Sequence, residues 1–219
     1  HALHKFNGKV GVNRSMVNQV RRAQMTLTEA IYRRQSVRNF NGQPLETEHM
    51  MMLKGTARNV PRLSDAPIRF VFLEGTEKAS EVLQGIVGSY GKVKDAPLMI
   101  VGIVGKNGHA LESLGFSMEY LVLEATRHNL GTCWISGTFD RRRLLAQISL
   151  GDEEQVAAVV PVGYPKVTKG HDVLKLVIGS RNRKAVHEIF FADVWGGHVQ
   201  ERFERQPRLA RMADSVRWA

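Results

Sequence analysis

The chain has very little cysteine, because Cys133 is the only one among 219 residues. A single thiol cannot form a disulfide within the chain or build a metal site from several cysteines, and it fits a reducing compartment. Cys133 lies in the apolar stretch 131–135, where a buried, unreactive thiol is expected rather than a nucleophile. We therefore expect a cytoplasmic protein whose chemistry does not depend on cysteine.

The sequence also lacks the spacings typical of a metal centre and the long apolar run typical of a membrane protein. Its eight histidines are scattered, without an HExxH pattern or another close ligand spacing. No stretch approaches the roughly 18 to 20 apolar residues of a membrane-spanning helix, and residues 1–9 lack the apolar region of a signal peptide. These absences predict no bound metal and no membrane anchor.

Acidic residues are fewer than basic ones, 21 against 31, which gives a formal net charge of +10. Such a balance admits nucleic acid or an anionic membrane surface as a partner. The basic residues are spread along the whole chain, however, and no helix-turn-helix, zinc-finger or RNA-recognition signature accompanies them. Nucleic-acid or membrane-surface binding is therefore a secondary hypothesis, with residues 1–24 and the run Arg141–Arg143 as candidate contacts.

Apolar spacing divides the chain into alternating helices and strands. Helices are predicted at residues 26–35, 45–59, 78–87, 111–129 and 140–148. The fourth helix is predicted to end in a left-handed cap at Gly131, and the fifth to begin with Asp140 as its N-cap. Dense apolar and β-branched runs predict buried strands at residues 68–73, 97–104, 132–135 and 155–163. This alternation favours a sandwich of the α+β or α/β class around a mixed sheet.

The strongest functional signal is a group of arginines at the end of the first predicted helix. Arg33, Arg34, Ser36 and Arg38 fall within six residues. Guanidinium groups bind phosphate oxygens through paired hydrogen bonds, and a serine hydroxyl adds a neutral donor between them. On residue types alone, a solvated basic helix end is the more common explanation. The alternative is an anion-binding segment.

The order of residues around this group is more specific than its composition. Residues 30–40 read Ala-Ile-x-x-Arg-x-Ser-Val-Arg-x-Phe and resemble the N-terminal signature of the nitroreductase family, flavin enzymes in which this segment holds the phosphate of FMN. The resemblance implies a nitroreductase-like α+β fold, with a mixed sheet flanked by helices, and FMN as the cofactor. It also implies that Arg34, Gln35, Ser36 and Arg38 contact the phosphate.

Two later segments carry the same resemblance. The segment after the long predicted helix resembles the strand and turn that lie against the flavin ring in nitroreductases, which implies ring contacts for Ser136 and Gly137. A glycine suits this position because a backbone that passes over a planar ring has no room for a Cβ. Residues 180–190 resemble a basic segment that returns to the FMN phosphate, and Arg183 and Lys184 are the candidates there.

The resemblance also suggests how the chain is organised. Residues 209–219 are similar to a helix of a divergent, thermophile-type branch of nitroreductases, where it leads into a motif beside the flavin. Because the chain stops at Ala219, we expect a shortened protein that lacks part of the flavin site. Three regions are predicted: a basic N-terminal extension over residues 1–24, an FMN-binding domain over 25–195, and a C-terminal helical segment over 196–219.

The activity implied is that of an NAD(P)H-dependent flavin oxidoreductase. In a ping-pong cycle NAD(P)H reduces FMN, and a small electron-poor acceptor, such as a nitroaromatic or a quinone, then takes the electrons. Since the flavin carries the redox chemistry, no catalytic side chain is assigned. The family usually buries FMN at a homodimer interface, so a homodimer is expected, with a pseudo-dimeric monomer as the alternative. The rival functions are a basic nucleic-acid or membrane-surface binding protein on a degenerate nitroreductase-like fold, and a flavin binder without reductase activity.

Overall fold

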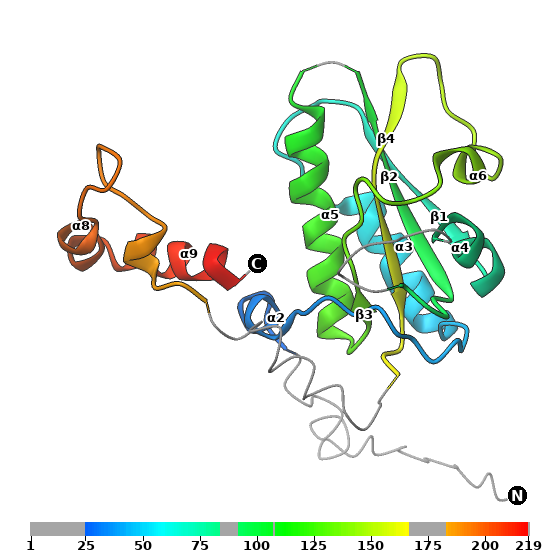
Figure 1. Ribbon diagram of the computed structural model, residues 1–219, viewed down its shortest axis with the longest axis horizontal. Coiled ribbons are helices and arrows are strands. Elements are labelled where there is room, and N and C mark those ends of the chain that lie inside the picture. The colour runs from blue at the N-terminus through cyan, green and yellow to red at the C-terminus, as the bar shows by residue number, and fades with distance from the viewer. Residues whose placement is uncertain (1–24, 84–91, 107, 167–182, 219) are drawn as a thin grey trace, which may run out of the picture.

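A four-stranded antiparallel sheet lies at the centre of the computed structural model (Figure 1), which describes residues 25–83, 92–106, 108–166 and 183–218. The strands in spatial order are β1 (Ile68–Glu74), β2 (Leu98–Gly105), β4 (Glu154–Gly163) and β3 (Gly131–Thr132). Two isolated parallel bridges, Ser36 with Thr132 and Asn39 with Lys94, add to the antiparallel pairs. The predicted α+β class is confirmed, and the three long strands lie within one residue of their predicted ends.

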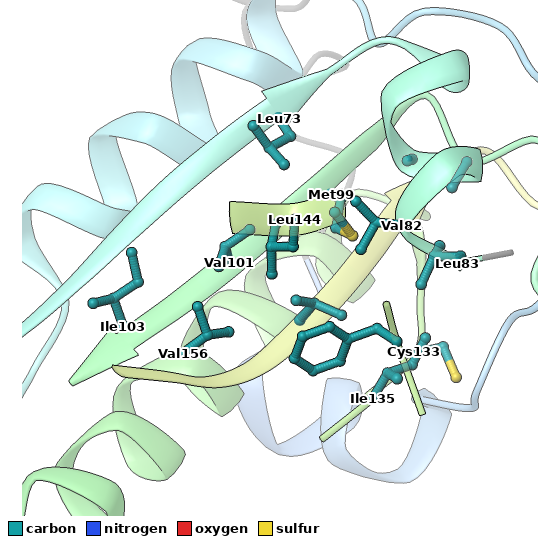
Figure 2. Close-up of a cluster of buried hydrophobic side chains, with 14 of the residues drawn as sticks. Leu73, Val82, Leu83, Met99, Val101, Ile103, Cys133, Ile135, Leu144 and Val156 are labelled. Atoms are coloured by element: carbon teal, nitrogen blue, oxygen red, sulfur yellow. The ribbon is translucent and has the colours of Figure 1, made fainter. Parts of the chain in front are cut away.

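Helices cover both faces of this sheet. One face carries α3 (Thr47–Asn59) and α5 (Ala110–Arg127), and the other carries α4 (Thr76–Leu83) and α6 (Arg141–Leu145). Because a strand repeats every two residues, β2 serves both cores. Leu98 and Ile100 lie in the core with α3 and α5, whereas Met99, Val101 and Ile103 lie in the core with α4 and α6 (Figure 2). In the described part of the chain, every helix is too short or too polar to cross a membrane.

The end of α5 differs from the prediction. The helix stops at Arg127, and the left-handed residue after it is Asn129, with φ 59°, rather than Gly131. Asparagine tolerates this conformation better than most residues because its short side chain can hydrogen-bond locally. Gly131 lies instead in β3, without a positive φ. The predicted cap was therefore assigned to the wrong residue.

Strand β3 is shorter than the predicted strand at residues 132–135 because of a proline in its neighbour. The register pairs Thr132 with Val162, which places Cys133 opposite Pro161. Proline has no N–H to donate, so the ladder is interrupted there. Pairing returns in the same register as an isolated bridge between Ile135 and Val159.

The remaining predicted helices are present with shifted ends. Helix α3 begins at Thr47 rather than at residue 45, and α6 ends at Leu145 rather than at residue 148. The predicted N-cap is confirmed, because the Asp140 carboxylate accepts hydrogen bonds from the first backbone N–H groups of α6. Helix α4 begins two residues early, and its predicted last residues, 84–87, lie outside the described residues.

The C-terminal region packs on the first helix. The helices here are α2 (Leu27–Arg33), the short 3-10 helix η1 (Val186–Glu188), α8 (Gln200–Arg205) and α9 (Pro207–Trp218). Helices α8 and α9 lie to one side of the sheet, with the end of α9 beside α2 (Figure 1). Tyr32 of α2 donates a hydrogen bond to Asp214 at 2.8 Å and meets the ring of Trp218 edge-on. The predicted extension over residues 1–24 lies outside the described residues.

An ion pair across the sheet gives the fold a measurable pH dependence. Arg69 of β1 donates two hydrogen bonds to Glu154 of β4, at 2.7 and 2.6 Å. These bonds, together with one from the backbone N–H of Gly151, lower the pKa of Glu154 to about 2. The ionised carboxylate is thus favoured by folding. Its contribution is complete above the ordinary pKa near 4.5 and is lost as the pH falls from there toward 2.

Replacing Glu154 with glutamine is therefore expected to destabilise the fold at pH 7 by roughly 1 kcal/mol, a modest value because the pair is partly exposed to solvent. The loss should shrink as the pH is lowered through the range between 4.5 and 2. Urea unfolding of both proteins at pH 7 and at low pH measures the difference. Glu153→Gln, at an exposed neighbouring position, is the matched control for the change in charge. A difference that stays constant with pH would rule out this role for Glu154.

Candidate functional site

The segment that follows α2 runs along the edge strand of the sheet. Helix α2 ends at Arg33, its C-cap Arg34 has left the helical conformation with ψ 135°, and Ser36 forms a parallel bridge with Thr132 of β3. The backbone N–H of Val37 donates to the carbonyl of Thr132 at 2.8 Å, and the carbonyl of Arg38 accepts from Lys94 at 2.8 Å. In an extended chain, alternate side chains lie on the same side. Arg34, Ser36 and Arg38 are therefore expected to share one side of this segment.

Two glycines allow this segment to pack closely against the sheet. Gly131 and Gly163 are partners in the ladder between β3 and β4. A Cβ at Gly131 would lie 2.7 Å from the side chain of Val37, and a Cβ at Gly163 would lie 3.0 Å from the ring of Phe40 and 2.5 Å from Pro97. Any larger residue at either position would push the segment away from the sheet. This role could not be predicted from the sequence, because the two glycines are paired only in the folded register.

Three side chains of this segment influence the pKa of the buried Cys133 thiol. Burial raises the pKa of the Cys133 thiol, and this rise is opposed by the charge of Arg38, by a polar contact with Ser36 and by the charge of Arg34. The three side chains therefore lie near Cys133, at the start of the loop after β3. The thiol itself is kept in its neutral form, as expected for an inert cysteine. Gln35, between them, is exposed.

Arg34 has little exposure to solvent. Its side chain is only 11% exposed, and its buried Nε meets no hydrogen-bond acceptor. The nearest carboxylate oxygen, Oε1 of Glu119 on α5, lies 3.6 Å away, which is an ion-pair distance but too long for a hydrogen bond. A buried N–H group without a hydrogen-bond acceptor is costly. An anion that supplied acceptor oxygens would relieve this cost.

The second predicted part of the site is an exposed turn. Ser136 and Gly137 follow the Ile135 bridge and both face solvent. A Cβ added at Gly137 would meet nothing within 4 Å, so the fold itself does not require a glycine there. The space above this backbone is open to a flat ligand. Just before the turn, Nε1 of Trp134 donates a hydrogen bond to Oε2 of Glu119 at 2.7 Å.

Glu119 was not among the predicted site residues. It contacts Arg34 on one side and Trp134 on the other, and so joins the two predicted parts of the site. Burial raises the pKa of its carboxyl, whereas the hydrogen bond from Trp134 and the charge of Arg34 act in the opposite direction. In the sequence it is one glutamate in an amphipathic helix. Only the packing of α5 against α2 and the loop after β3 reveals its position.

The predicted C-terminal contacts lie beside α9. Arg183 donates a hydrogen bond to the carbonyl of Trp218 at 3.3 Å, and its guanidinium carbon lies 5.5 Å from the centre of that ring. The carbonyl of Lys184 accepts from Arg217 at 3.3 Å. The contacts found for Arg183 and Lys184 are thus with the end of α9, which itself packs on α2. Their expected approach to the phosphate remains a prediction.

The arginine run of the rival hypothesis is largely engaged within the chain. Arg141 donates to the carbonyl of Val156 at 3.1 Å and lies over the ring of Phe139. Arg143 pairs with Asp140 and also donates to a carbonyl of α4. These contacts stabilise α6 against its neighbours. They do not favour the run as a continuous surface for nucleic acid.

Comparison with known proteins places the chain in a family. The family model described as "Putative TM nitroreductase" matches residues 26–215. Among solved structures, a nitroreductase family protein from Clostridium difficile 630 gives a TM-score of 0.61 at 19% identity, covering 78% of this chain and 99% of that one. No curated protein matches the chain.

Two further solved structures are similar. An FMN-dependent nitroreductase from Clostridium difficile R20291 gives a TM-score of 0.54 at 23% identity, covering 64% of this chain and 88% of that one. A nitroreductase with bound FMN from Bacteroides fragilis NCTC 9343 gives 0.53 at 18% identity, covering 66% and 95%. At these identities the likeness establishes the fold. Because the family model spans most of the sequence, including the arginine segment and the loop after β3, this chain belongs to the nitroreductase family that the model describes.

Proposed function

We propose that the protein is an FMN-dependent oxidoreductase that passes electrons from NAD(P)H to a small electron-poor acceptor. The family assignment supports the reaction class, and two relatives of similar fold are named as FMN-dependent or FMN-bound. One observation carries the choice of cofactor. Arg34, Ser36 and Arg38 belong to one extended segment and all lie near Cys133, where a phosphate would meet two cations and a hydroxyl.

The residues present fit FMN at both ends. On the phosphate side, the side chain of Arg34 is only 11% exposed and pairs with Glu119 through Nε, so a phosphate at its terminal nitrogens would form charge-assisted hydrogen bonds in a largely buried setting. On the ring side, the open space over Gly137 leaves room for a planar group. We assign the phosphate to the segment after α2 and to the basic residues beside α9, namely Arg34, Gln35, Ser36, Arg38, Arg183 and Lys184. We assign the flavin ring to the turn after β3, at Ser136 and Gly137.

Bound FMN would supply the redox chemistry, taking a hydride from NAD(P)H and giving electrons to a nitroaromatic or quinone-type acceptor in a ping-pong cycle. The protein's own groups hold and orient the cofactor. Arg34 and Arg38 neutralise the phosphate, and the backbone at Ser136 and Gly137 supports the ring. No side-chain acid or base is assigned. The buried Cys133 thiol, with its raised pKa, takes no part as a nucleophile.

We further propose that the working unit is a homodimer built from the FMN-binding domain over residues 25–195, with the segment over 196–219 contributing contacts. Helix α9 leaves Met212 and Val216 exposed, and Trp195 before α8 is almost fully exposed. Apolar side chains of this size on a surface favour a partner. Light scattering after gel filtration is expected to give twice the mass of one chain.

The proposed function is tested by whether the protein retains FMN and whether NADH or NADPH reduces the bound flavin. The purified protein, incubated with FMN and then desalted, should retain the visible absorption bands of oxidised flavin. These bands should bleach on anaerobic addition of NADH or NADPH and return when a quinone is added. Retained flavin that neither nucleotide reduces would indicate a flavin binder without reductase activity. Absence of retained flavin together with salt-sensitive retention on DNA would support the nucleic-acid hypothesis instead.

A further inference from the structure

Glu119 lies where three separate parts of the chain meet. It projects from α5 toward the end of α2 and toward the loop after β3. One carboxylate oxygen lies 3.6 Å from Nε of Arg34, and the other accepts the indole hydrogen bond of Trp134 at 2.7 Å. Its side chain is 29% exposed. Both oxygens are thus directed to groups that flank the proposed FMN site.

The two edges of the Arg34 guanidinium have different surroundings. Its Nε faces Glu119 and is buried. The edge formed by its two terminal nitrogens is directed away from Nε and therefore away from this carboxylate. A guanidinium can bind one anion along each edge because its five N–H groups lie in one plane. With Glu119 on the Nε side, the terminal nitrogens are left for a second anion.

We propose that Glu119 is a positioning residue that orients the guanidinium of Arg34 for the cofactor phosphate and, through Trp134, links this end of the site to the turn at Ser136 and Gly137. The inference rests on the proposed function. Glu119 would also repel a phosphate directly, although in this arrangement the guanidinium would lie between the two anions. The proposal requires that the gain from holding Arg34 in one orientation exceed this repulsion. The hydrogen bond from Trp134 and the charge of Arg34 both favour the ionised carboxylate against its burial.

The test is flavin selectivity, since FMN and riboflavin differ only in the phosphate. Glu119→Gln keeps an acceptor for Trp134 and removes the charge that faces Arg34. We expect its FMN affinity to fall about tenfold, the effect of losing one charge-assisted contact. Riboflavin affinity should stay unchanged. Titration of the apoprotein, followed by quenching of flavin fluorescence, measures both. Glu112→Gln, at an exposed position of the same helix, is the matched control.

A double-mutant cycle tests whether Glu119 acts through Arg34. In the Arg34→Met background, Glu119→Gln should have no further effect on FMN affinity, because the group that it orients is gone. Trp134→Phe, which removes the hydrogen bond to Glu119, should give the same selective loss of FMN and serves as a second variant if Glu119→Gln does not fold.

Three results would overturn this role. Equal weakening of FMN and riboflavin would show a general structural effect, additive losses in the cycle would show independent action, and tighter FMN binding would show that Glu119 competes with the phosphate. Failure of the proposed function is distinct from these. In that case the wild-type apoprotein binds neither flavin, and both proposals fall.

Discussion

Replacing Arg34 and Arg38 together with methionine is expected to weaken FMN binding about a hundredfold or more. Each arginine would give the phosphate at least one charge-assisted hydrogen bond, and such bonds contribute roughly 1.5 to 3 kcal/mol each. Two of them correspond to a loss of at least about 3 kcal/mol, or two orders of magnitude in the dissociation constant. Methionine retains an unbranched apolar stem in place of the arginine methylenes, so the fold should be kept.

The control for this variant is a protein that loses the same charge elsewhere. Arg33 is exposed at the end of α2, and Arg142 is exposed on α6. The Arg33→Met/Arg142→Met protein should bind FMN within a few-fold of the wild type, because long-range attraction is weakened by salt. Fluorescence titration with FMN and riboflavin distinguishes the two proteins. A comparable loss in both would mean that the overall positive field, rather than this segment, holds the phosphate.

Much of the fold could be predicted because its signals are local. The three long strands are continuous apolar runs, and their ends were predicted to within one residue. The carboxylate of Asp140 stands directly before α6 and caps it as expected. The errors arise where contacts between residues distant in the sequence determine the end of a helix or strand. Pro161 interrupts the ladder opposite Cys133, and Asn129 takes the left-handed conformation that was predicted for Gly131.

For the candidate site, too, only the residues with a local sequence signal could be predicted. The order of residues between Arg34 and Arg38 predicted a common anion-binding segment. Arg34, Ser36 and Arg38 all lie near Cys133, and their binding of an anion stays a prediction. The role of Glu119 could not be predicted, because its contacts with Arg34 and Trp134 depend on how α5 packs. Arg183 shows the limit of a motif. It was assigned to the phosphate, and the contacts found for it are with Trp218.

Gly163→Ala is expected to destabilise the protein by about 2 to 3 kcal/mol, the usual cost of overpacking a filled site. The added Cβ would lie 2.5 Å from Cδ of Pro97 and 3.0 Å from the ring of Phe40, which is fully buried. Neither neighbour can yield easily, since one is a proline ring and the other is enclosed by the core. Thermal unfolding should show a decrease in the melting temperature of roughly 5 to 10 °C.

The same substitution at Gly55 is the matched control and should have the opposite sign. Gly55 lies inside α3, where a Cβ would meet nothing within 4 Å, so alanine should stabilise the helix by about 0.5 to 1 kcal/mol.

The Gly163→Ala substitution should also affect the candidate FMN site. If Phe40 is displaced, the segment from Arg34 to Arg38 loses its anchor beside β3, and Gly163→Ala should weaken FMN binding at temperatures where the protein is still folded. Unchanged stability in Gly163→Ala would show that Pro97 and Phe40 can move apart, and that Gly163 does not fix this segment.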